Sequence, residues 1–254
     1  MNIFISNDDG IGAEGIRKLT AALSAVADVY VGAPLGQCSA TSHSISLWEP
    51  LHVTEADVPG AKRAYAIDGM PADCVKLGLG LMEKEGIVID KVFSGINHGG
   101  NLGTDTIYSG TVAAALEGLL CGYPSVAVSI NAFQPAHYEM AEELAVKAAL
   151  LDFADIGDPM MLNINVPDLP KSEVKGVKIT GLGRREYRGE FVEKGSEGPA
   201  RRFIYAGEPV HYHDIDCDTN DVGADQEGYA AVVPMRFDLT NYALIEELRE
   251  KWHF

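Results

Sequence analysis

The sequence contains few cysteines, and no two of them are closely spaced. The four in the chain are Cys38, Cys74, Cys121 and Cys217. A C-x-x-C pair would indicate a zinc or redox site, and a dense, even set would indicate a disulfide scaffold. In a chain of 254 residues, these four separated cysteines indicate neither class of protein.

Positive charge is also scarce. The chain has 20 Lys and Arg residues against 37 Asp and Glu residues, which gives a formal net charge of −17. Such a surface repels nucleic-acid backbones and anionic membranes, so we predict neither a nucleic-acid duplex nor a membrane as the partner. A small phosphate substrate would need a local positive centre, which a bound metal ion could supply.

Long apolar runs are missing as well. No run approaches the about 20 residues that span a bilayer. The N-terminus enters a predicted strand without the basic and apolar regions of a signal peptide. With 46% hydrophobic and 22% charged residues, the composition is that of an ordinary globular protein. We therefore expect a cytoplasmic protein.

Strand and helix patterns alternate along most of the chain. Residues 3–6 form an apolar run, a helical period follows, and a second apolar run ends at Pro34. This βαβ pattern recurs, which predicts a Rossmann-like α/β fold: a three-layer αβα sandwich with a mostly parallel sheet. Short alternating segments at 45–47 and 51–53 predict peripheral strands.

We interpret the chain as a single domain. Its core is expected at about 1–170 and 229–240, and a C-terminal helix at about 241–252. The polar, charged stretch at about 171–228 predicts an excursion, an extended β-hairpin arm whose strands lie at 177–180 and 202–205.

Two adjacent carboxylates follow the first predicted strand, in the run Asn7-Asp8-Asp9-Gly10. Open α/β folds bind ligands at the carboxyl edge of the sheet, where this strand ends. Neighbouring carboxylates repel each other unless a cation or a shared proton intervenes, and hard divalent cations take oxygen ligands. The run indicates a metal site, although a solvated turn closed by Asp9-Gly10 would explain the same residues.

Two later segments are expected at the same edge. The hydroxyl-rich segment 37–44 follows the second strand and is either a polar loop or a source of an oxygen ligand. Residues 94–105 follow another predicted strand and contain four glycines, with Asn97 and Asn101 among them. Glycines allow close approach of the backbone to a ligand, and the two amides add neutral polar groups.

A helix start follows at Ser109-Gly110-Thr111. Ser109 can cap the helix, and Gly110 leaves room for an anion beside the first N–H groups. An ordinary N-cap would explain Ser109 alone. The glycine-rich loop in front of it favours an anion site.

Together these motifs resemble the SurE-type survival-protein nucleotidases. The matching segments are 7–11, 33–34 with 39–46, 94–103, 108–112 and 122–127, with weaker matches at 183–185, 228–229 and 238–240. The resemblance implies a divalent-metal-dependent phosphomonoesterase that acts on nucleoside 5′-monophosphates, often on 3′-monophosphates, and in some relatives on short-chain polyphosphate.

The resemblance also implies the site residues. One divalent cation per subunit, such as Mn²⁺ or Mg²⁺, is expected on Asp8, Asp9, Ser39 and Asn97. We predict that Asp8 is catalytic, either by orienting or deprotonating the attacking water or as the nucleophile. The predicted phosphate- and substrate-binding residues are Asn7, Asn101, Ser109, Gly110 and Thr111. A homodimer or homotetramer built through the arm and C-terminal helix is expected, and His98 is at most a supporting group.

Two departures from the family pattern carry expectations of their own. Ala40 stands where relatives have glycine, which suits a position that does not need a positive φ. Asn220-Asp221 stands where relatives have a Gly-Thr-Asp run, so substrate contacts from this segment are not predicted.

Two other classes fit less well. A receiver-like signalling protein needs an Asp where Ser94-Gly95 stands. A non-catalytic Rossmann-type nucleotide-binding protein should carry G-x-G-x-x-G after the first strand, where this chain has carboxylates.

Overall fold

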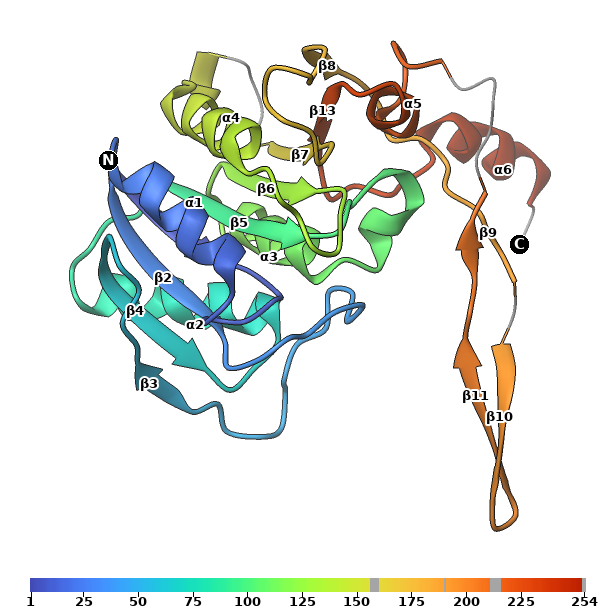
Figure 1. Cartoon of the computed structure of the whole chain (residues 1–254), viewed down its shortest axis with the longest axis horizontal. Coiled ribbons are helices and arrows are strands. Elements are labelled where there is room, and N and C mark those ends of the chain that lie inside the picture. The colour runs from blue at the N-terminus through green and yellow to red at the C-terminus, as the bar shows by residue number, and fades with distance from the viewer. Residues whose placement is uncertain (156–159, 190, 211–215, 253–254) are drawn as a thin grey trace.

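A nine-stranded sheet forms the centre of the described part of the chain, which comprises residues 1–155, 160–189, 191–210 and 216–252 of the computed structural model. The strand order is β3-β4-β2-β1-β5-β6-β7-β13-β8. Parts of the predicted arm, residue 190 and residues 211–215, lie outside the described residues. Figure 1 shows the sheet with helices on both sides, which confirms the predicted three-layer α/β architecture.

Six neighbouring strands of the sheet run parallel. They are β1 (Asn2–Ser6), β2 (Asp28–Pro34), β4 (Ala61–Ile67), β5 (Lys91–His98), β6 (Ser125–Ile130) and β7 (Met161–Val166). Parallel strands in such a fold are buried on both faces, which explains their continuous apolar runs. Their carboxyl ends therefore meet at one edge of the sheet.

Three shorter strands complete the sheet. β3 (Val53–Glu55) pairs antiparallel with β4, and β13 (Ala230–Met235) pairs antiparallel with β7. β8 (Val177–Ile179) pairs parallel with β13 at the far edge. The prediction that 177–180 belongs to the arm hairpin is wrong, because a short alternating segment does not indicate which strand it will pair with.

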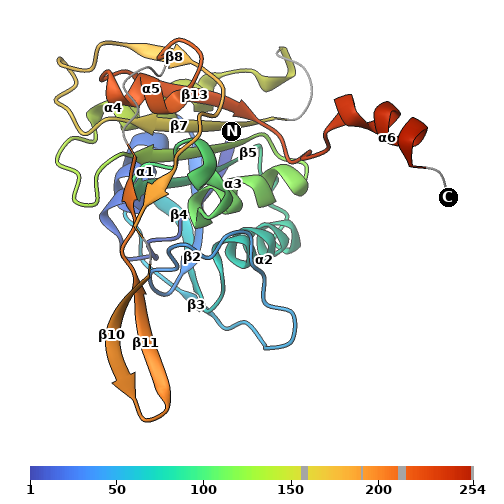
Figure 2. The ribbon, with the colours of Figure 1, turned by 90° about the vertical axis from the view of Figure 1, so that its right-hand side faces the viewer.

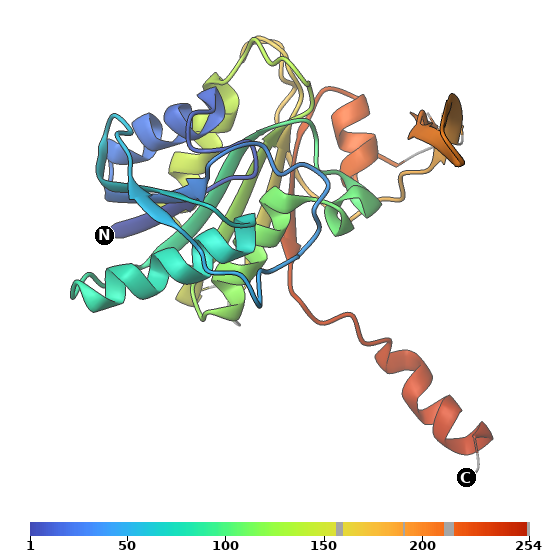
Figure 3. The same ribbon diagram turned by 90° about the horizontal axis from the view of Figure 1, so that it is seen from below.

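Helices cover both faces of the sheet. α1 (Glu14–Ser24) and α4 (Glu139–Leu150) pack on one face, against the side of β1 that carries Ile3 and Ile5. α2 (Pro71–Lys84) and α3 (Gly110–Leu120) lie on the other face, where Phe4 points. Alternate residues of a strand point to opposite faces, so a single strand supplies both cores. Figure 3 shows the two helical layers.

The remaining helices are short. They are the 3-10 helices η1 (Gly103–Ile107), η2 (Phe153–Asp155) and η3 (Tyr242–Leu244), and the α-helices α5 (Asp221–Gln226) and α6 (Ile245–Lys251). The predicted C-terminal helix is confirmed as η3 and α6, which extend away from the sheet (Figure 3). Among the described helices, none is long and apolar enough to span a membrane.

A hairpin projects from the body of the protein (Figures 1 and 2). Its strands are β10 (Phe191–Glu197) and β11 (Ala200–Tyr205), and all their residues are exposed. At its root β9 (Tyr187–Arg188) pairs with β12 (Glu208–Pro209). The predicted arm strand at 202–205 is thus confirmed.

The predicted strand at 45–47 is wrong, because these residues form no strand. The backbone N–H of Ser46 donates to Asp73 Oδ1 at 3.0 Å, and its hydroxyl donates to Asp73 Oδ2 at 2.8 Å. A carboxylate on α2 therefore binds this segment in place of a neighbouring strand.

Candidate active site

Asp8 and Asp9 follow the carboxyl end of β1, where Asp8 is buried and Asp9 is half-buried. Asp8 is 5% exposed. Burial raises the pKa of Asp8 to about 6. A hydrogen bond from the Thr111 hydroxyl to Asp8 Oδ1 lowers this pKa, and the neighbouring charge of Asp9 raises it further. Burial also raises the pKa of Asp9, whose Oδ2 accepts from the backbone N–H of His98 at 3.2 Å. A cation between these two carboxylates would stabilise both.

The structure brings five of the predicted site residues into one cavity of about 420 Å³. They are Asp8, Ser39, Asn97, Asn101 and Ser109. Asp8 and Ser39 lie on the segments that follow β1 and β2, Asn97 lies near the end of β5, and Asn101 and Ser109 follow β5. β1 and β5 are the neighbours at which the strand order reverses direction. Open α/β folds bind ligands at such a switch point. The sheet topology therefore supports a ligand site here.

Oxygen atoms dominate the expected ligand set. The amide nitrogen of Asn97 donates to the Gly99 carbonyl at 2.7 Å, so the amide oxygen is the atom that remains for a cation. Ser39 is exposed on its loop, and its hydroxyl accepts from Gln37 Nε2 at 2.9 Å. Asp9 does not line the cavity. Carboxylate, hydroxyl and amide oxygens suit Mg²⁺ or Mn²⁺ rather than a softer metal.

A second group of possible ligand atoms lies elsewhere. Ligand atoms of Asp216, Cys217 and Asp218 lie within 4.8 Å of one another. The Lys178 ammonium already contacts Cys217 Sγ at 2.9 Å and forms an ion pair with Asp218. Because a cationic side chain fills this position, we favour Asp8 and Asp9 as the metal centre.

The N-terminus of α3 packs directly on Asp8. A Cβ placed on Gly110 would lie 2.8 Å from Asp8 Cβ and 2.9 Å from Asp8 Oδ2, so only glycine permits this approach. Ser109 caps the helix by accepting from the Val112 N–H at 3.0 Å. Thr111 is fully buried and uses its hydroxyl on Asp8. The positive end of the helix dipole therefore lies beside the catalytic candidate.

Asn7 holds the turn that presents the two carboxylates. Its Nδ2 donates to the Gly10 carbonyl at 2.9 Å, and its Oδ1 accepts from the Gly10 N–H at 3.2 Å. Gly10 has φ +98, which few other residues adopt. Asn7 is fully buried and does not line the cavity, so its binding of substrate stays a prediction.

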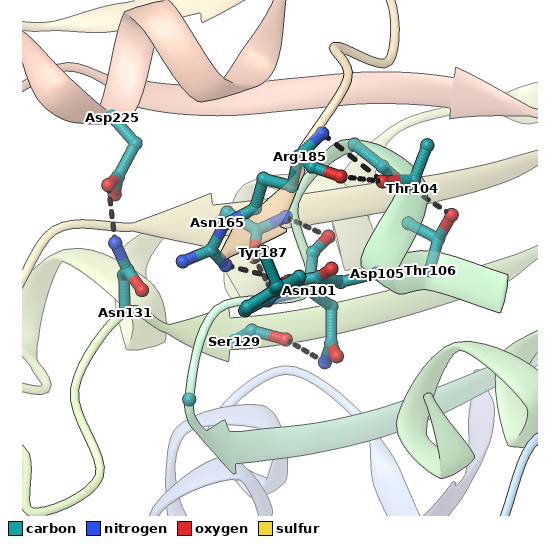
Figure 4. A network of polar contacts seen from close by, with 12 residues as sticks. Asn101, Thr104, Asp105, Thr106, Ser129, Asn131, Asn165, Arg185, Tyr187 and Asp225 are labelled. Carbon is teal, nitrogen blue, oxygen red and sulfur yellow. Dashed lines mark hydrogen bonds and ion pairs between the residues drawn. The ribbon is translucent and has the colours of Figure 1, made fainter. Parts of the chain in front are cut away.

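Asn101 is fixed by polar groups on two strands (Figure 4). Its N–H donates to Asn165 Oδ1 at 2.7 Å, and its Nδ2 donates to Ser129 Oγ at 2.8 Å. Its carbonyl accepts from Asn163 at 2.9 Å and from Asn165 at 3.0 Å. These partners were not predicted from the sequence. Asn163 and Asn165, two polar residues inside the otherwise apolar strand β7, are the feature that could have indicated them.

The root of the arm forms another wall of the cavity. Arg185 Nη1 pairs with Asp105 Oδ2 at 2.9 Å, and the Tyr187 hydroxyl donates to the same oxygen (Figure 4). All three residues line the cavity, and Arg185 is the only Lys or Arg among its described lining residues. Burial, with the bond to Asp105, raises the pKa of Tyr187 to about 12. Arg185 and Tyr187 were predicted only as part of the arm, and Asp105 as the end of the glycine-rich segment 94–105.

The loop that carries Ser39 contains strained backbone. Ala40 has φ +56 and Ser42 has φ +55. The expectation that position 40 does not need a positive φ is therefore wrong. Ser42 holds the loop by donating from its N–H to the Tyr108 carbonyl at 3.0 Å and from its hydroxyl to the Ile107 carbonyl at 2.6 Å.

The two loop histidines have different surroundings. His98 lines the cavity, and its Nε2 lies 2.7 Å from the Tyr138 hydroxyl. His43 does not line this cavity, and its Nε2 lies 2.8 Å from a carboxylate oxygen of Glu117 on α3. Lys76 binds the other oxygen of Glu117 at 2.9 Å. His43 therefore anchors its loop to α3.

Asp221 supports the glycine-rich loop rather than the cavity wall. It is fully buried, and its two oxygens accept from the Gly183 N–H at 2.7 Å and the Gly103 N–H at 2.8 Å. Asn220 caps α5 by accepting from the Gly223 N–H at 2.9 Å. Neither residue lines the cavity.

A larger cavity of about 770 Å³ lies between α3 and the segment 233–239. Val112, Leu116, Val233 and Phe237 contribute apolar surface to it, and neither Asp8 nor Asn97 lines it. None of the predicted metal ligands Asp8, Asp9, Ser39 and Asn97 lines it, although it shares Ser109 with the smaller cavity, so we do not take it as the candidate active site.

Comparison with known proteins identifies the family of the chain. The family model "Survival protein SurE" matches residues 3–189. Two similar relatives are named 5′-nucleotidase SurE: that of Pelotomaculum thermopropionicum is 44% identical, covering 98% of this chain and 95% of the relative, and that of Desulfitobacterium hafniense is 42% identical, covering 98% and 96%.

A solved structure is also similar. The crystal structure of the SurE protein from Aquifex aeolicus superposes with a TM-score of 0.82 at 34% identity, covering 99% of both chains. The family model, the relatives and this structure agree over most of the sequence. The chain therefore belongs to the Survival protein SurE family.

Proposed function

We propose that the chain is a divalent-metal-dependent phosphomonoesterase that hydrolyses nucleoside 5′-monophosphates to nucleoside and phosphate. The name of the relatives, 5′-nucleotidase SurE, supports the nucleotide substrate. The observation that carries the proposal is the contact between buried Asp8 and the N-terminus of α3, in a cavity that also contains Ser39 and Asn97.

Asp8, Asp9, Ser39 and Asn97 would hold one divalent cation, such as Mn²⁺ or Mg²⁺. The fit is supported by the two adjacent carboxylates, whose pKa values are raised mainly by burial. When bound, the cation would polarise a phosphoryl oxygen and lower the pKa of a water molecule.

Asp8 would orient and deprotonate the attacking water. The Thr111 hydroxyl holds one carboxylate oxygen, and Gly110 lies against the other, so the carboxylate has a fixed orientation. Nucleophilic attack by Asp8 itself is the alternative; acid quenching during turnover would trap the resulting aspartyl-phosphate.

The transferred phosphoryl group would lie at the start of α3. The N-terminus of α3 favours an anion. The Ser109 N–H donates to the Thr106 carbonyl at 3.4 Å and the backbone of Thr111 donates to Asp8, which leaves the Gly110 N–H for the phosphoryl group. Asn101 and Arg185 line the same cavity, and Arg185 supplies a positive charge in a chain of net charge −17. These contacts address the phosphoryl group, so we propose that 3′-monophosphates and short-chain polyphosphate are also hydrolysed.

Phosphate release from a panel of nucleoside monophosphates tests the proposal. The panel is assayed with Mn²⁺ or Mg²⁺ and again with excess chelator. We expect release that depends on the metal. Nucleotide binding by the folded protein without release under any metal would instead indicate a non-catalytic nucleotide-binding protein.

We also propose that the chain forms a homodimer or homotetramer through its two projecting segments. Phe191 and Phe203 on the hairpin are 66% and 48% exposed, and Leu248 on α6 is 50% exposed. Apolar surface of this kind on projecting elements is typical of interfaces. Light scattering after size exclusion would show the oligomer, and a monomer at micromolar concentration would contradict it.

A further inference from the structure

Aromatic side chains gather at the wall of the candidate active-site cavity. Tyr108, Phe133 and Tyr187 all line it, together with Asp8 and Ser109. Phe133 belongs to the loop that follows β6 and is 89% exposed. Single exposed aromatic residues are common on protein surfaces, and what distinguishes Phe133 is its position at the wall of this cavity.

Phe133 and the proposed metal ligand Asn97 both lie next to Gly99. A Cβ placed on Gly99 would lie 3.7 Å from Phe133 Cε1 and 3.8 Å from Asn97 Nδ2. The ring therefore lies beside the backbone of the glycine-rich loop. Gly99 and Gly100 have no side chains that could fill the cavity between this ring and the catalytic groups.

Tyr187 is a second aromatic wall, supplied by the root of the arm. Its hydroxyl donates to Asp105, and the Arg185 guanidinium carbon lies 5.8 Å from the centre of its ring. These two contacts fix the orientation of the ring (Figure 4). The cavity thus combines oxygen ligands and a helix N-terminus with aromatic rings from three separate segments.

We propose that Phe133, assisted by Tyr187, is the site that binds the nucleobase of the substrate, an inference that rests on the proposed function. A phosphoryl group held at α3 leaves the sugar and base to extend toward these aromatic rings. Aromatic side chains stack on bases with little regard to base identity. The site therefore accepts all common bases but discriminates against phosphomonoesters that lack an aromatic base.

The test compares two substrates in Mn²⁺, adenosine 5′-monophosphate and glycerol 2-phosphate. In Phe133→Ala, we expect the ratio of kcat/KM for the nucleotide to kcat/KM for glycerol 2-phosphate to fall about 10-fold, in line with the loss of one base stack. The change lies in KM for the nucleotide rather than in kcat. Phe133→Tyr keeps an aromatic ring and should retain the wild-type ratio.

Phe237→Ala is the matched control, because Phe237 is 56% exposed and lines the other, apolar cavity. It should leave the ratio unchanged. An unchanged ratio in Phe133→Ala, or an equal loss of kcat/KM on both substrates, overturns the base-binding site. In either case, phosphate release by the wild type still supports the proposed function. Release from neither substrate by the wild type overturns the proposed function and this inference together.

Discussion

Gly110→Ala introduces one methyl group between the start of α3 and the carboxylate of Asp8. Its Cβ would lie 2.8 Å from Asp8 Cβ, 2.9 Å from Oδ2 and 3.2 Å from Cγ, whereas ordinary contacts lie at 3.4–4 Å. The carboxylate or the helix must therefore move by about 0.6 Å or more, because close-packed interiors leave no spare room. The hydrogen bond from Thr111 to Asp8 would shift with it.

The expected cost falls mainly on activity. Overpacking of this kind destabilises by about 1–3 kcal/mol, and alanine offsets about 1 kcal/mol of this because it favours helix over glycine. A catalytic group displaced by about 1 Å can lose about 100-fold in rate. We therefore expect kcat for a nucleoside monophosphate to fall by one to two orders of magnitude while the protein stays folded.

The assay measures steady-state phosphate release together with urea unfolding. Gly80→Ala is the matched control, because Gly80 lies within α2 and a Cβ there meets no heavy atom within 4 Å. The control should keep wild-type kcat and gain up to about 1 kcal/mol in unfolding free energy. A wild-type kcat in Gly110→Ala would refute the claim that catalysis depends on the exact placement of the Asp8 carboxylate.

Three further substitutions test separate parts of the structure. Ala40→Gly should raise the urea-unfolding free energy by about 1 kcal/mol, because φ +56 strains alanine; a loss of stability would contradict this. Asp225→Asn should leave the unfolding free energy unchanged below pH 3.8 and raise it increasingly between pH 3.8 and about 6, to about 3 kcal/mol at pH 8, because burial raises the Asp225 pKa to about 6; lower stability at pH 8 would show that the hydrogen bond from Asn131 and the attraction to Arg185 outweigh burial. Asn165→Ala removes the acceptor of the Asn101 N–H, so kcat/KM should fall about 10-fold; an unchanged kcat/KM would show that Asn101 keeps its position without this hydrogen bond.

The sequence predicted the parts of the fold that depend on local pattern. The alternation of strands and helices indicated the parallel sheet, and this placed Asp8 and Asn97 at the ends of β1 and β5, now found at one cavity. The helix start at Ser109 was also readable, because a capping serine acts within one turn.

The rest depends on pairings between distant residues. Arg185 and Asp105 are separated by 80 positions, and no periodicity links them. Val177 joins the main sheet only because β13 returns to it, which a three-residue strand cannot indicate. The backbone at Ala40 has φ +56 because its surroundings hold it there, although alanine prefers a negative φ. Such features come from tertiary contacts, and residue type alone does not determine them.

The central claim is that Asp8 carries the hydrolysis of a nucleoside monophosphate. The direct measurement is phosphate release from adenosine 5′-monophosphate in Mn²⁺ by the wild type and by Asp8→Asn, with folding checked by circular dichroism. We predict metal-dependent release by the wild type and, in the folded variant, a loss of about 1,000-fold or more, the scale expected when a catalytic group that acts as part of a unit is removed. Wild-type release by Asp8→Asn would contradict the account.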